Sequence, residues 1–144
     1  MAQSREVIEP RQSKAEVVVD SPEDVFLLLA AKASGLDHAH LWRVDLDLGN
    51  GVLGYELIAS GGHDARMVHP LLIFRGAQAA GAAKIVLVHN HVSQMPAASD
   101  EDQAITDIMA AFGDSRGIPV YDHVIVTKTA YFSFKEAGRI AAQG

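Results

Sequence analysis

Apolar residues along this chain recur with two different spacings, one typical of helices and one typical of strands. The helical spacing is clearest at residues 99–117, where apolar side chains lie three or four positions apart behind a serine cap. Residues 21–35 begin with Ser-Pro and acidic residues and end at a glycine, as helices commonly do. Residues 69–82 combine apolar and small side chains after a proline, which suits a buried helix. These three segments are predicted to be helices.

Shorter apolar runs that are rich in β-branched residues predict strands. The run at residues 84–91, KIVLVHNH, is continuous, as expected for a central strand covered on both faces. Two further runs are joined by Gly49-Asn50-Gly51, which is a strong hairpin signal. The predicted strands are residues 40–47, 51–60, 84–91, 120–128 and 130–134, with a short strand at residues 15–20.

These elements follow one another without an internal repeat or a linker of low complexity. We predict a polar N-terminal tail and short strand over residues 1–19, and a single domain over residues 20–144. Residues 61–68 are predicted to form a loop, and a short helix is predicted to begin at Lys135. The alternation of helices with strands predicts an α/β fold, in which a mixed β-sheet is packed between helices.

The composition narrows the classes of function. Hydrophobic residues make up 49% and charged residues 21% of the 144 residues, as in globular proteins. The absence of cysteine excludes disulfides, cysteine nucleophiles and thiolate metal ligands. The 12 basic residues are scattered along the chain and outnumbered by 18 acidic ones, which gives a net charge of −6. We therefore expect no direct binding of duplex DNA. With no secretory apolar region and no apolar stretch of membrane-spanning length, we expect a cytoplasmic protein without membrane association.

Two histidines and an aspartate form the most specific chemical pattern in the chain. His89 and His91 are two positions apart on a predicted strand, so their side chains leave the same face. Asp102 lies three residues after Ser99, in the first turn of the next helix, where it can point back at the strand end. Two imidazoles and one carboxylate suit a zinc ion and leave one position open for a water molecule that zinc activates as a nucleophile.

The same residues also have a purely structural interpretation. Ser99 and Asp102 have the spacing of a capping box, and an acid is favourable at the positive end of the helix dipole. A histidine at a strand end is commonly a hydrogen-bonded surface residue, so spacing alone leaves both interpretations open. Asp122 and His123 form another acid–base pair, but neighbours on a strand face opposite ways, which favours structural roles for both.

A family resemblance favours the metal site. The stretch HNHVSQMPAASDEDQAIT resembles the signature of the RadC-like branch of the JAB/MPN (JAMM) zinc metallohydrolase superfamily, and SPEDV, LDLGNGVL, VHP, DHVIV and SFKEAG match in order. The resemblance covers residues 21–138 and implies a JAB/MPN-like fold with zinc on His89, His91 and Asp102. It also implies that Ser99 stabilises the oxyanion of an attacked amide, and that the substrate is a peptide or isopeptide.

Three positions near this site depart from the family pattern. The family carries a glutamate as general acid/base, and alignment without gaps puts Ala39 in its place. Loss of such a group typically costs ~10²–10⁴-fold in rate, which predicts impaired hydrolysis. Asp37 is the nearest substitute, but its side chain is short. Val92 and Gln94 replace a proline and a glycine of the family, which is expected to reshape the loop beside the zinc.

Two functions therefore remain in competition. The first is a metallopeptidase or isopeptidase that uses water activated by zinc, impaired by Ala39. The second is a non-catalytic interaction module that zinc stabilises and that acts through a protein partner, associated with the DNA repair label of the RadC name.

Overall fold

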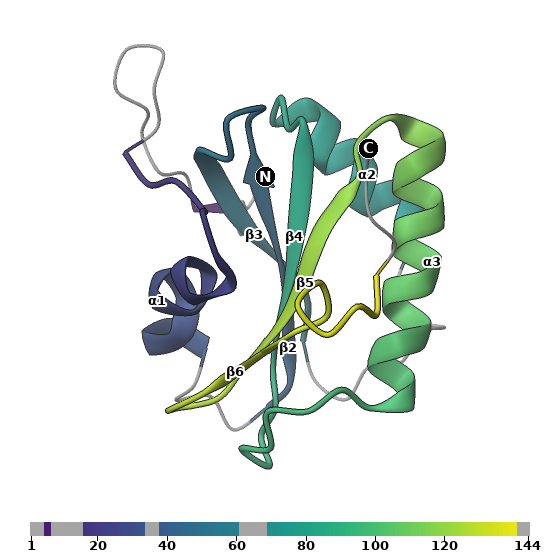
Figure 1. Ribbon diagram of the computed structural model, residues 1–144. Coiled ribbons are helices and arrows are strands. Elements are labelled where there is room, and N and C mark those ends of the chain that lie inside the picture. Colours follow the sequence, from purple (N-terminus) through teal and green to yellow (C-terminus); the bar gives the residue numbers. More distant parts are fainter. Residues whose placement is uncertain (1–4, 7–15, 34–37, 61–68, 141–144) are drawn as a thin grey trace.

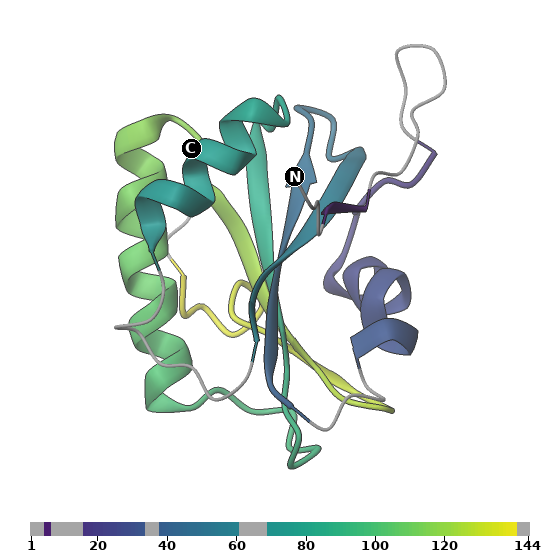
Figure 2. The same cartoon turned by 180° about the vertical axis from the view of Figure 1, so that it is seen from behind.

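The computed structural model describes residues 5–6, 16–33, 38–60 and 69–140 (Figures 1 and 2). The helices within these ranges are α1 (Pro22–Ala33), α2 (Pro70–Ala79) and α3 (Asp100–Arg116). The strands are β1 (Arg5–Glu6), β2 (His40–Leu46), β3 (Val52–Ser60), β4 (Lys84–Asn90), β5 (Val120–Val126) and β6 (Tyr131–Ser133). The three predicted helices and the five longer predicted strands are confirmed, each within a few residues of its predicted ends. None of the helices in these ranges has the length and apolar character needed to cross a membrane.

All six strands within the described ranges join one mixed sheet in the order β1-β3-β2-β4-β5-β6. The pair β4–β5 is parallel, and the other neighbouring pairs are antiparallel. The predicted hairpin between β2 and β3 is present, and Asn50 adopts a left-handed backbone conformation there, with a φ of 69°. The predicted α/β fold with a mixed sheet is therefore confirmed.

Helices cover both faces of this sheet, with α1 on one face and α2 and α3 on the other (Figures 1 and 2). The alternation of side chains along β4 divides its residues between the two layers. Val86 and Val88 belong to the core under α1, whereas Ile85 and Leu87 belong to the core under α2 and α3. The same alternation turns His89 toward α3, and this is how the fold positions the candidate site.

A buried charged network attaches α2 to the sheet. Arg43 on β2 is 1% exposed and bonds Asp45 through Nε at 2.7 Å and Glu56 through Nη2 at 2.8 Å. Its Nη1 donates to the carbonyl of Ile73 on α2 at 3.1 Å. A β-carbon at Gly76 would lie 2.6 Å from Nη1, so α2 can approach the guanidinium only because residue 76 is glycine.

The chain ends differ from the sequence-based expectation. Arg5–Glu6 form β1 against β3, inside the segment predicted to be a tail. The strand predicted at residues 15–20 is reduced, in its described part, to an isolated bridge between Val18 and Gly51. The helix predicted from Lys135 is wrong: residues 134–138 form turns, because Gly138 adopts a φ of 69°. The predicted loop at residues 61–68 and Asp37 lie outside the described residues.

Candidate metal centre

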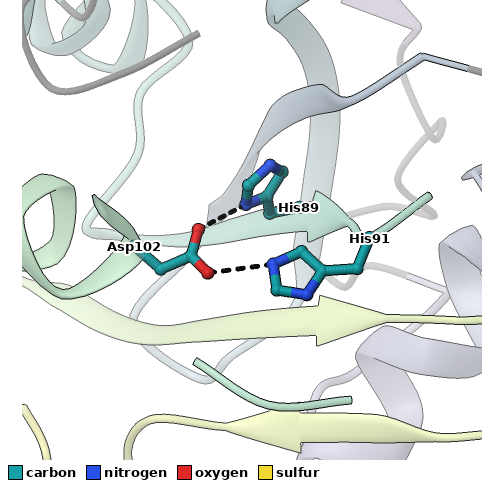
Figure 3. A group of neighbouring side chains, drawn as sticks. All are labelled: His89, His91 and Asp102. Atoms are coloured by element: carbon teal, nitrogen blue, oxygen red, sulfur yellow. Dashed lines mark hydrogen bonds and ion pairs between the residues drawn. The ribbon is translucent and has the colours of Figure 1, made fainter. Parts of the chain in front are cut away.

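The structure brings together the two histidines and the aspartate that the sequence pattern singled out. In Figure 3, His89 and His91 at the end of β4 point toward Asp102 in the first turn of α3. The Nδ1 atom of His89 lies 2.8 Å from Oδ1 of Asp102, and Nε2 of His91 lies 2.9 Å from Oδ2. One ligand atom from each side chain lies within 4.8 Å of the other two. This is close enough for all three to share one metal ion.

The capping box and the histidine contacts use the same carboxylate. The Ser99 hydroxyl accepts the Asp102 N–H at 3.1 Å, and Asp102 Oδ2 accepts the Ser99 N–H at 2.9 Å. The hydroxyl of Ser99 also donates to Oδ2 at 2.8 Å. The two interpretations left open by the spacing are thus compatible, since the cap holds the carboxylate in the direction of the histidines.

The electrostatics of this cluster favour an ionised carboxylate. Burial alone would raise the pKa of Asp102, but hydrogen bonds from His89, His91 and the Ser99 N–H outweigh it and hold that pKa well below its ordinary range. The hydrogen bond to Asp102 raises the pKa of His91 despite the opposing effect of desolvation. An anionic carboxylate beside two imidazoles is a donor set that suits a divalent transition metal.

The second ring nitrogen of His91 has a partner that fixes the ring. Its Nδ1 atom lies 2.9 Å from the carbonyl oxygen of Met95. Because a carbonyl only accepts, Nδ1 must carry the proton, and Nε2 faces Asp102 as the potential ligand atom. In metal sites, the ring nitrogen of a histidine ligand that does not bind the metal commonly donates its N–H to a backbone carbonyl.

A cavity of about 300 Å³ opens over these three side chains. Ala39 lies in its wall together with Ser99, Glu101 and Ile105. The position aligned with the family's glutamate therefore does face the candidate site, but it offers only a methyl group. Ser99 is placed next to the cluster, and its role toward an oxyanion stays a prediction.

Two residues that sequence reasoning missed, Asn90 and Thr106, hold the surroundings of the cluster. Asn90, between the two histidines, accepts the His40 N–H and donates to the His38 carbonyl, which anchors the segment containing Ala39. The Thr106 hydroxyl donates to the Asp102 carbonyl at 2.8 Å. An asparagine inside an apolar strand was the one visible signal, because a buried amide needs partners.

The pair Asp122 and His123 faces opposite sides of the sheet, as the strand pattern predicted. The His123 Nδ1 atom lies 2.6 Å from the Thr106 hydroxyl on α3, and its ring is 6.2 Å from that of His89. Asp122 accepts the Ser133 hydroxyl and the Lys135 N–H instead. Burial raises the pKa of Asp122, although these hydrogen bonds oppose the effect.

The mixed sheet, the two histidines at a strand end and the aspartate on the following helix fit the pattern expected of a JAB-type domain. The chain belongs to the RadC-like JAB domain family, whose model matches residues 19–139. It is 37% identical over 135 residues to a UPF0758 protein of Methanococcoides burtonii, covering 89% of this chain and 59% of that protein. It is 41% identical over 123 residues to a UPF0758 protein of Rubrobacter xylanophilus, covering 85% of this chain and 54% of that protein. The chain thus spans little more than half the length of these relatives.

Proposed function

We propose that this domain holds a zinc ion on His89, His91 and Asp102 and binds peptide or isopeptide amides, which it hydrolyses slowly at best. The observation that supports this proposal is the convergence of two imidazoles and one ionised carboxylate beneath a cavity whose wall contains Ala39. The donor set fits zinc, which prefers histidine nitrogen and carboxylate oxygen in sites that keep a position open.

A zinc ion held there would supply Lewis-acid polarisation of the amide carbonyl and activation of water. Two residues of the chain, Ser99 and Ala39, bear on the remaining steps of hydrolysis. Ser99 lies at the cavity and can turn its hydroxyl toward the amide oxygen once a cation shares the charge of Asp102. Ala39 can neither accept a proton from the attacking water nor deliver one to the leaving amine, which is a loss of ~10²–10⁴-fold in rate.

The same alanine favours a second candidate, a non-catalytic interaction module that zinc stabilises. A site that keeps its ligands but lacks a proton carrier retains affinity for an amide without turning it over. With a net charge of −6 such a module has no general attraction for duplex DNA, so an association with DNA repair would require a protein partner.

Substitution at residue 39 separates the two candidates. Zinc-loaded Ala39→Glu, Ala39→Gln and the natural protein are assayed on a fluorogenic model isopeptide. We expect the Glu variant alone to gain hydrolysis, by ~10²-fold or more, because Gln has the same size without a basic carboxylate. Equal cleavage by the natural protein would show that another group serves as the base. Absence of cleavage by the zinc-loaded Glu variant would remove the hydrolase proposal and leave the interaction module.

A further inference from the structure

Gln94 occupies an unfavourable backbone conformation beside the candidate metal centre. Its φ is 65°, in the left-handed region that glycine adopts easily and other residues rarely do. It closes the turn that follows His91, because its N–H donates to the His91 carbonyl at 3.0 Å. A glutamine at such a position needs a compensating contact.

The glutamine side chain makes two contacts, of which the weaker is the bond that its Nε2 donates to the His91 carbonyl at 3.4 Å. Its Oε1 atom accepts the backbone N–H of Lys128 at 2.8 Å, across 34 positions of sequence. Lys128 lies in the turn between β5 and β6, which is closed by the Thr127 N–H bonding the Ala130 carbonyl at 2.9 Å. The loop after His91 is therefore attached to a second, hydrogen-bonded turn.

The attachment bears directly on a predicted metal ligand. Met95, the next residue after Gln94, offers the carbonyl that lies 2.9 Å from Nδ1 of His91. The same carbonyl also accepts the Ala97 N–H at 2.9 Å. A shift of Gln94 would displace this carbonyl, and with it the orientation in which Nε2 of His91 faces Asp102 at 2.9 Å. Removal of a group that hydrogen-bonds a metal ligand typically lowers metal affinity by ~10–100-fold.

We infer that Gln94 is a positioning residue for His91: its tether to the β5–β6 turn holds the Met95 carbonyl on the His91 ring and thereby sets the metal affinity of the centre. The inference rests on the proposed metal site and explains why a glutamine stands at a left-handed position.

Zinc affinity, measured by competition with a chromophoric chelator, tests this role. Gln94→Gly removes the tether and accepts the left-handed backbone, so its fold is not penalised. Gln94→Glu keeps an oxygen that can accept the Lys128 N–H and loses only the long Nε2 bond to the His91 carbonyl. Lys128→Ala keeps the N–H itself. We expect zinc affinity to fall ~10-fold or more in Gln94→Gly and to stay near the natural value in the other two variants.

A second readout in the zinc-free protein keeps this test independent of the metal site itself. Nitrogen NMR of the His91 ring is expected to show a hydrogen-bonded Nδ1–H in the natural protein and its loss in Gln94→Gly. Equal zinc affinity in Gln94→Gly and the natural protein would overturn the inference. If the natural protein binds no zinc, the proposed function fails, and the ring signals decide the inference alone: an unchanged His91 ring in Gln94→Gly overturns it.

Discussion

The side chain of Asn90 bridges β4 to the chain segment that contains Ala39. Its Oδ1 atom accepts the His40 N–H at 2.6 Å, and its Nδ2 atom donates to the His38 carbonyl at 2.9 Å. Asn90 is 2% exposed and stands between the two predicted metal ligands, on the opposite face of the strand. One strand end therefore presents the ligands and also fixes the wall of their cavity.

Replacing Asn90 by alanine tests this bridge. Asn90→Ala leaves two backbone groups without their partner, so the free energy of unfolding should fall by about 1–3 kcal/mol. Zinc content should be unchanged, because both histidines keep their places on the opposite face of β4. Urea denaturation measures the first effect, with Gln78→Ala as the control for loss of an exposed amide. A stability equal to that of the natural protein would contradict the bridging role.

Gly76 should tolerate no side chain. Because Arg43 is fixed by Asp45 and Glu56, its guanidinium cannot move away from a β-carbon at residue 76. Gly76→Ala is expected to lower the free energy of unfolding by about 1–3 kcal/mol through overpacking. Gly49→Ala is the matched control, since the nearest atom to its added β-carbon is 3.7 Å away. Thermal denaturation of both variants would show a loss in the first alone, and equal melting temperatures would contradict the packing argument.

Much of this fold could be predicted from the sequence because the local conformational preferences of the residues agree with the tertiary structure. The β2–β3 hairpin and the Ser99 cap were predicted from residue types whose conformational preferences are strong. The helix from Lys135 was predicted wrongly because the backbone turns at Gly138, where the Arg139 N–H bonds the Phe134 carbonyl at 2.8 Å. β1 was missed because two residues show no periodicity.

Of the candidate site, only the three potential metal ligands could be predicted from the sequence. His89, His91 and Asp102 lie within 13 positions of one another, at spacings that strand and helix geometry interpret directly. Gln94 and Asn90 act through backbone groups 34 and 50 positions away, and no local pattern records such partners. Their roles can be recognised only when the three-dimensional positions of these partners are known.

Zinc affinity should depend on pH through His91. The pKa of His91 is raised, so near neutral pH a proton competes with the metal for the ring. Asp102 stays ionised over the same range because its pKa is lowered. Affinity should therefore rise with pH, by about tenfold per unit below the raised pKa of His91, and level off above it. Chelator competition between about pH 6 and pH 8 measures this slope, and a flat profile would argue that His91 is no ligand.

The zinc-free protein should show the opposite trend in stability. A raised folded-state pKa at His91 stabilises the fold below the ordinary histidine value, and this contribution is lost as pH rises through the raised value. The lowered pKa of Asp102 contributes stability above the ordinary aspartate value, which is lost as pH falls through the acidic range. Urea denaturation with chelator present should show both losses in the natural protein. Asp102→Asn should remove both, and persistence of the neutral-pH loss in that variant would contradict the His91–Asp102 pairing.

Zinc content of the purified protein tests the central claim most directly. Elemental analysis is applied to untagged natural protein, His91→Ala and His69→Ala, all prepared without chelator. His69 is an exposed histidine at the start of α2 whose side chain makes no capping bond, which makes it the matched control. We expect about one zinc per chain in the natural protein and in His69→Ala, and a large loss in His91→Ala. Absence of zinc in the natural protein, or equal zinc in His91→Ala, would contradict the metal centre.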